Sequence, residues 1–142
     1  MFVDASAIVA ILTQEPDYEL FIEHIDKADP GSLITSVLAA WEAVNGLSRI
    51  KGYSIAEAEA RVRKFLSASG IQIVGIAPEE LTLALLAFDR YGRHRLPPED
   101  RNRALNLADC FHYACAKSRG LPILHKDLGL KMTDVASVNS TH

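Results

Sequence analysis

Residues 1–12 read MFVDASAIVAIL, and this stretch carries the pattern from which we predict the fold. Phe2 and Val3 form a short apolar run that ends at Asp4, which is typical of a buried strand. The apolar residues that follow have helical spacing over residues 6–13, and either Asp4 or Ser6 can cap that helix. The stretch therefore predicts a short strand, then a helix, with a carboxylate at the junction.

The same alternation of strand and helix continues along the chain. We predict further strands at 33–35, 71–74, 122–124 and 134–136, and further helices at 16–28, 36–51, 54–68, from 78 onward and at 105–118. The strands are apolar throughout, which is typical of a parallel sheet covered by helices on both faces. We therefore expect one α/β domain over residues 1–142, with a short central parallel sheet between helices.

The composition indicates a globular domain, because 49% of its 142 residues are hydrophobic and 23% are charged. The net charge of −3 does not favour a nucleic-acid binder, so any affinity for phosphate has to come from a local basic patch or from bound cations. No apolar run reaches the length of a membrane span, and the first residues read as a strand rather than as a signal peptide. We expect a cytoplasmic protein that does not enter a membrane.

Two acidic residues directly follow predicted strands. Asp4 comes after the first strand, and Asp127 comes after the strand at 122–124. Ligands of an open parallel sheet bind beyond the carboxyl ends of its strands, so these carboxylates are expected at the same edge of the sheet. For Asp4, capping the next helix is an equally good explanation.

Glu42 lies on the predicted helix at 36–51, at the border of an apolar stripe made of Val37, Trp41 and Val44. A carboxylate in that position is costly unless a cation lies nearby. The alternative is a side chain that reaches solvent from the margin of the stripe.

Asp109 lies within the predicted helix at 105–118, where Asp is an unfavourable residue. Its spacing places it on a polar face with Asn106, His112 and Tyr113, apart from a core stripe of Leu107, Phe111, Ala114 and Cys115. Either this polar face is exposed to solvent, or Asp109 and Asn106 face a pocket above the sheet.

Carboxylates that converge on one pocket repel one another unless cations are bound. A site with oxygen ligands and without cysteine or paired histidines suits Mg²⁺ or Mn²⁺ rather than zinc. Such ions can act on both the attacking and the leaving oxygen of a phosphodiester. The acidic residues therefore point to metal-dependent cleavage of a phosphodiester.

The segment from residue 90 to residue 103 is predicted to be a loop and is rich in arginine. It can hold a phosphate backbone through Arg90, Arg93, Arg95, Arg101 and Arg103. The alternative is a solvated loop in which arginines pair with Glu99 and Asp100. Nothing in the sequence selects a residue for contact with a base among Tyr91, His112 and Tyr113.

Five stretches occur in a fixed order: MFVDASA (1–7), WEAV (41–44), LNLADCFHYA (105–114), ILHKD (123–127) and TDV (133–135). In this order and spacing, residues 1 to about 137 resemble the PIN-domain ribonucleases, in particular the VapC-type toxins of bacterial toxin–antitoxin pairs. The segment 105–114 is the most specific, and the opening strand is next.

The resemblance implies a PIN-like fold and endonucleolytic cleavage of RNA with Mg²⁺ or Mn²⁺, which leaves 5′-phosphate and 3′-hydroxyl ends. By position it implies that Asp4, Glu42 and Asp109 hold the metal. It also implies that Ser6 supports the first of these acids and that Asn106 lies beside the third. The implied partners are RNA, a cognate antitoxin whose tail covers the acidic pocket, and a second copy of the chain.

One region departs from the pattern of these relatives, which often carry Gly-Asp-Asp-Phe after the penultimate strand. Aligned on residues 133–134, the positions of those acids hold Leu128 and Gly129 here. Asp127 is then the candidate for the fourth catalytic acid, and without it three acids still hold one ion. A catalytically weak module of the same fold that binds RNA or a protein is the alternative function, and a receiver-like domain phosphorylated on Asp is a third hypothesis.

Overall fold

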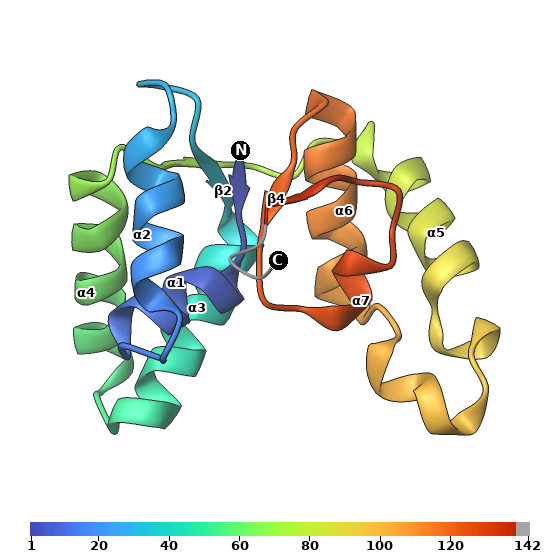
Figure 1. The fold of residues 1–142 in the computed structure, drawn as a ribbon, viewed down its shortest axis with the longest axis horizontal. Helices are drawn as coiled ribbons and strands as arrows, with labels where there is room; N and C mark the ends of the chain where they lie inside the picture. Colours follow the sequence, from blue (N-terminus) through green and yellow to red (C-terminus); the bar gives the residue numbers. More distant parts are fainter. Residues whose placement is uncertain (139–142) are drawn as a thin grey trace.

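The computed structural model describes residues 1–138, which form a parallel sheet between two groups of helices (Figure 1). The strand order is β3-β2-β1-β4-β5, with bounds β1 (Phe2–Val3), β2 (Ile34–Ser36), β3 (Gln72–Val74), β4 (Ile123–Leu124) and β5 (Ser137–Val138). All four pairs of neighbouring strands are parallel. This confirms the predicted α/β class, although the last strand begins at Ser137 rather than at residue 134.

Seven α-helices and two short 3₁₀ helices are found within residues 1–138. They are α1 (Ala5–Leu12), α2 (Tyr18–Lys27), α3 (Val37–Lys51), α4 (Ile55–Ala68), α5 (Glu80–Tyr91), η1 (Arg93–Arg95), η2 (Pro98–Arg103), α6 (Leu107–Arg119) and α7 (Leu128–Lys131). The prediction that the segment 90–103 forms one loop is therefore wrong. Arg90 lies in the last turn of α5, and most of the other residues of the segment form η1 and η2. Within residues 1–138, none of the helices has the length and apolar character that crossing a bilayer requires.

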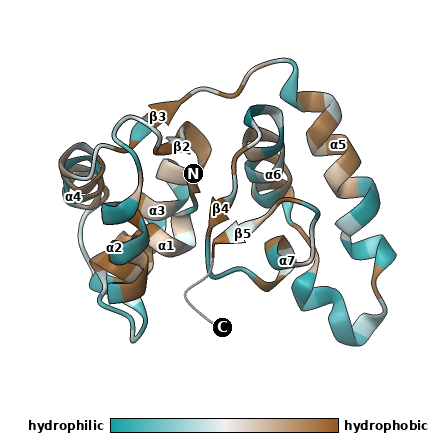
Figure 2. Cartoon of the chain, turned by 45° about the horizontal axis from the view of Figure 1, so that its top comes forward, coloured by the Kyte–Doolittle hydropathy of each residue, from teal (hydrophilic) through white to brown (hydrophobic). Residues whose placement is uncertain are grey.

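The sheet separates two apolar cores. Phe2 and Val3 are both fully buried but belong to different cores, because successive side chains of a strand point to opposite faces. Val3 packs with α1 to α4, and Phe2 packs with α5 and α6 (Figure 1). Figure 2 shows hydrophobic residues on the central strands and hydrophilic ones at the turns between α5 and α6.

The buried side of α3 differs from the predicted stripe. Trp41 and Val37 are 63% and 57% exposed, and the buried residues are Ala39, Ala43, Gly46 and Leu47. The reason is the close approach of α1, since a Cβ on Gly46 would lie 3.1 Å from Val9 Cγ2. Small side chains face that contact, and the large apolar ones lie outside it.

The buried side of α6 also differs from the prediction. Leu107, assigned to the core stripe, is 75% exposed, whereas the predicted polar residues His112 and Tyr113 are fully buried. The helix starts two residues later than predicted, at Leu107, because the Asn106 side chain caps it. Since α6 packs on both α5 and the sheet, its face toward the sheet is buried whether its residues are polar or not.

A buried ion pair joins the last turn of α6 to the first turn of α5. Arg119 Nη1 donates to Glu80 Oε1 at 2.8 Å, and the backbone N–H of Ala77 donates to the other oxygen of the same carboxylate. The Glu80 side chain is 2% exposed and that of Arg119 is 31% exposed. The pair therefore fixes α5 against the helix that carries Asp109 and His112.

We expect Arg119→Ala to lower the free energy of unfolding by about 2 kcal/mol, because it leaves the Glu80 carboxylate buried without a cation. Lys117→Ala is the matched control on the same helix. Lys117 and Asp134 form an ion pair whose two side chains are each 42% exposed, so its loss is expected to cost less than about 1 kcal/mol. Urea denaturation of both variants measures the difference, and equal losses would contradict this account.

Candidate metal centre

Asp4 lies where β1 ends, and the neighbouring strand holds it there. Its backbone N–H donates to the Leu124 carbonyl at 3.0 Å. Its Oδ2 accepts hydrogen bonds from the Ser6 N–H at 3.0 Å and the Ser6 hydroxyl at 2.6 Å, so Asp4 caps α1. The Ser6 hydroxyl in turn accepts the backbone N–H of Lys126 at 2.9 Å. Ser6 thus orients the Asp4 carboxylate and ties the end of β1 to the segment after β4.

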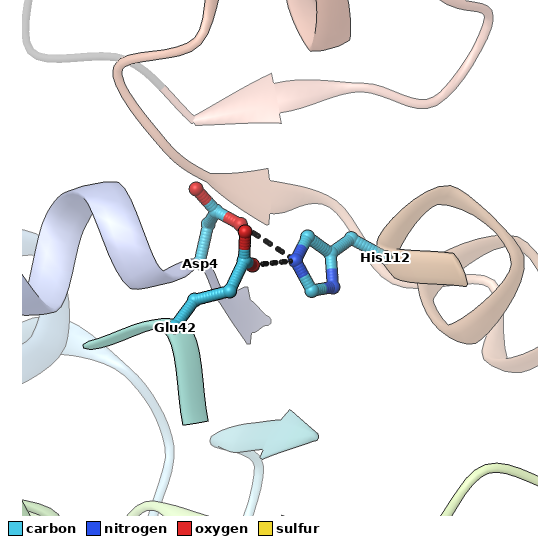
Figure 3. Close-up of side chains that lie close together, drawn as sticks. All are labelled: Asp4, Glu42 and His112. Carbon is cyan, nitrogen blue, oxygen red and sulfur yellow. Dashed lines mark hydrogen bonds and ion pairs between the residues drawn. The ribbon is translucent and has the colours of Figure 1, made fainter. Parts of the chain in front are cut away.

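Glu42 and His112 converge on the other oxygen of Asp4 (Figure 3). His112 Nε2 lies 2.5 Å from Glu42 Oε1 and 3.6 Å from Asp4 Oδ1. One ligand atom from each of the three residues lies within 4.8 Å of the other two. The cluster therefore joins the end of β1, the middle of α3 and the middle of α6, which are far apart in the sequence.

Two buried atoms of this cluster lack a hydrogen-bond partner among residues 1–138. They are Asp4 Oδ1 and His112 Nδ1. An unpaired carboxylate oxygen in a buried position is costly, and Asp4 as a residue is only 4% exposed. The position of Oδ1 beside Glu42 is therefore one where a cation would stabilise the protein.

When its ring is protonated, His112 brings positive charge to this cluster. Burial opposes the charged ring, but the hydrogen bond to Glu42 and the charges of Asp4, Glu42 and Asp109 act in the other direction. The net effect is that the pKa of His112 is raised above its ordinary value.

Asp109 lies beside the three-residue cluster rather than within it. It is the third residue of α6 and not a mid-helix residue, and it forms a capping box with Asn106. Burial is the largest of the causes that raise the pKa of Asp109 to about 7, followed by the charge of Asp127 and a smaller effect of Asp4. The hydrogen bond from the backbone N–H of Asn106 acts against them. Asp109, Asp127 and Asp4 thus form one electrostatically coupled group of carboxylates.

Asp127 caps the short helix α7. Its Oδ1 accepts hydrogen bonds from the backbone N–H groups of Gly129 at 2.7 Å and Leu130 at 3.1 Å. Leu128 and Gly129, which the resemblance aligns with acids of the relatives, have no side chain that can bind a metal. Gly129 packs so closely on η2 that a Cβ would lie 2.5 Å from the Arg103 carbonyl oxygen. Asp127 is the acid of this segment whose charge acts on Asp109.

From the sequence, His112 is predicted only as a possible contact to a base, whereas the structure places it in the cluster with Asp4 and Glu42. The available signal was its spacing of three residues from Asp109, which puts both side chains on one face of α6. Nothing in the local sequence shows that this face turns toward Asp4 and Glu42.

A family model of the PIN domain matches residues 1–136. The chain belongs to the PIN-domain family.

The relatives of this PIN-domain chain are VapC ribonucleases. One from Rhizobium meliloti (strain 1021) is 39% identical, and the match covers 94% of this chain and 98% of that protein. Another, from Mycolicibacterium smegmatis (strain ATCC 700084 / mc(2)155), is 34% identical over 98% of this chain and 100% of the relative. The chain is thus an endoribonuclease of the VapC toxin type, a family whose activity depends on metal ions.

Solved structures with low sequence identity share the fold of this PIN domain. VapC20 of Mycobacterium tuberculosis, a toxin that cleaves the sarcin–ricin loop, has a TM-score of 0.71 at 15% identity, covering 96% of this chain and 97% of that one. A toxin–antitoxin complex from Klebsiella pneumoniae has a TM-score of 0.69 at 14% identity, covering 99% and 97% of the two chains.

We expect the metal-free PIN domain to lose stability as the pH rises from about 4 to about 7. The pKa of Asp109 is raised to about 7 in the folded state, so the folded state binds a proton that the unfolded state has released in this window. Asp109→Asn should remove a few kcal/mol of this pH dependence while keeping an acceptor for the Asn106 N–H. Urea denaturation in a chelator at several pH values measures it, and parallel curves for the two proteins would contradict the assignment.

Proposed function

We propose that Asp4, Glu42, Asp109 and Asp127 are the catalytic acids of this ribonuclease, and that Asp4, Glu42 and Asp109 hold Mg²⁺ or Mn²⁺. The observation that carries the proposal is the buried Oδ1 of Asp4, which has no hydrogen-bond donor among residues 1–138 and lies beside Glu42. Ser6 and Asn106 are positioning residues in this proposal, because they hydrogen-bond to Asp4 and Asp109.

The donor set fits a divalent cation. Carboxylate oxygens are the ligands that Mg²⁺ and Mn²⁺ prefer, and three coupled carboxylates repel one another without a cation. When bound, such an ion supplies the positive charge that offsets the phosphodiester and polarises water for attack. The residues of the chain orient the acids: Ser6 holds one oxygen of Asp4, and the capping box holds one oxygen of Asp109.

RNA is the proposed substrate, and the arginines of residues 90–103 are proposed to bind its phosphates. Arg90, Arg93, Arg95, Arg101 and Arg103 are all exposed. Arg95 pairs with Asp89, which leaves less of its charge for RNA. The segment ends at the N-terminus of α6, and η2 packs against α7, whose cap is Asp127. The basic residues therefore lie at the end of the sheet that carries the acids.

We expect Asp4→Asn to reduce RNA cleavage by at least about a hundredfold. Changes in residues that merely support metal ligands already cost about 10- to 100-fold. Asp26→Asn is the matched control, because Asp26 is an exposed acid on α2. This variant should cleave RNA as fast as the unchanged protein. Initial rates with Mn²⁺ and with Mg²⁺ measure both variants.

Addition of EDTA should abolish cleavage, and the products should carry 5′-phosphate and 3′-hydroxyl ends. Cyclic-phosphate products that form in EDTA would contradict the proposal, since they indicate metal-free chemistry. RNA binding without turnover under all metal conditions would favour the alternative, a binding module of this fold in which the changed residues 125–130 have removed activity.

The double variant Arg101→Ala, Arg103→Ala should bind RNA more weakly, with a salt dependence reduced by about 0.7 per lost phosphate contact. Arg61→Ala, Arg63→Ala is the matched control. These two arginines of α4 pair with Glu57 and Glu59, and α4 lies on the opposite side of the molecule (Figure 1). Binding measured in EDTA at several salt concentrations, where the RNA stays intact, separates the two variants. Equal slopes for all three proteins would contradict the role of the arginines.

We also propose that the protein binds a cognate antitoxin and a second copy of itself, and that it is cytoplasmic. Residues 1–142 are proposed to form one PIN domain. Exposed apolar surface supports protein partners. One groove of about 730 Å³ between α3 and α4 is lined by Val37, Trp41 and Ile55 among others. On α5, Leu81, Leu85 and Phe88 are each more than half exposed and have the spacing of one helix face.

A further inference from the structure

We infer that His112 is a direct nitrogen ligand of the metal ion and makes this centre prefer Mn²⁺ to Mg²⁺. The inference rests on the proposed metal site and adds to it a residue outside the acidic set. It concerns the Nε2 atom, which lies 2.5 Å from Glu42 Oε1 and 3.6 Å from Asp4 Oδ1.

His112 Nε2 lies close to both Asp4 Oδ1 and Glu42 Oε1, so an ion held by these two oxygens would lie next to the imidazole. The three donor atoms lie within 4.8 Å of one another, and the ring is fully buried, 5.5 Å from the ring of Phe2 between centroids. His112 Nε2, once its proton is displaced, would offer its lone pair to the ion beside the carboxylate oxygens of Glu42 and Asp4. The unpaired Oδ1 of Asp4 supplies the second oxygen.

The other ring nitrogen does not prevent this role. Nδ1 makes no hydrogen bond with any of residues 1–138, so no partner forces the ring proton onto Nε2. Metal-binding histidines usually donate this second N–H to an acceptor, which makes the ring a stronger ligand. Because that acceptor is missing here among the described residues, we expect His112 to contribute a moderate rather than a large share of the affinity.

A nitrogen donor changes which ion the site prefers. Mg²⁺ favours oxygen ligands and gives up its water reluctantly, whereas imidazole is a common ligand of first-row transition metals. A centre with three carboxylates and one imidazole therefore discriminates between Mn²⁺ and Mg²⁺, which a centre of carboxylates alone does to a smaller degree. The imidazole of His112 thus distinguishes this metal centre from one made only of oxygen donors.

Two measurements test the inference without relying on activity. The first is pulsed electron paramagnetic resonance of the Mn²⁺-loaded protein, in which a coordinated imidazole gives coupling to ¹⁴N. We expect this coupling in the unchanged protein and in the control His24→Gln, and its loss in His112→Gln. The second is calorimetric titration with Mn²⁺ and with Mg²⁺. His112→Gln should weaken Mn²⁺ binding about tenfold and change Mg²⁺ binding by less than about threefold.

The outcomes separate this inference from the proposed function. Mn²⁺ binding that requires Asp4 but shows no ¹⁴N coupling in the unchanged protein would overturn the role of His112 and leave the acidic metal site standing. Equal losses of Mn²⁺ and Mg²⁺ affinity in His112→Gln would overturn the preference, since they indicate a role in holding Glu42 alone. Mn²⁺ binding that is absent, or that persists in Asp4→Asn, would overturn both proposals. The spectrum of the unchanged protein decides the ligand question even if His112→Gln fails to fold.

Discussion

A buried carboxylate oxygen without a hydrogen-bond donor is the feature on which the site depends. Asp4 Oδ1 is held away from water at the end of β1, next to the negatively charged Glu42. Concentrated negative charge of this kind raises the free energy of the folded chain, and a positively charged group has to offset it. His112 fills this role when its ring is protonated, and a bound ion can fill it instead. The same charge that destabilises the fold therefore prepares it for a cation.

The scaffold holds this arrangement through contacts that each serve two purposes. The hydrogen bonds from Ser6 cap α1 and at the same time leave Oδ1 of Asp4 facing the cluster. The capping box of Asn106 and Asp109 starts α6 and fixes one oxygen of Asp109. Asp127 caps α7 while its charge acts on Asp109. One carboxylate can therefore cap a helix with one oxygen and face the site with the other, so the two roles do not exclude each other.

The segment after β4 is constrained by its packing. Gly129 packs against the Arg103 carbonyl, so a larger residue at this position would displace η2. Asp127, the N-cap of α7, is the acid of this segment whose charge acts on Asp109. His112 adds an imidazole to the carboxylates of the cluster. The centre therefore combines the PIN fold with a cluster of carboxylates and one imidazole.

The sequence by itself determined the α/β class, the parallel sheet and the acids at its carboxyl edge, because apolar strands and capping residues are local signals. Asp4, for example, is placed by the strand before it and the helix after it. Only the tertiary structure decided which helix faces are buried. Trp41 is exposed because α1 approaches α3 closely at Gly46, and His112 is buried because α6 packs on both the sheet and α5. Helical spacing shows which residues share a face, but the neighbouring elements decide what that face contacts.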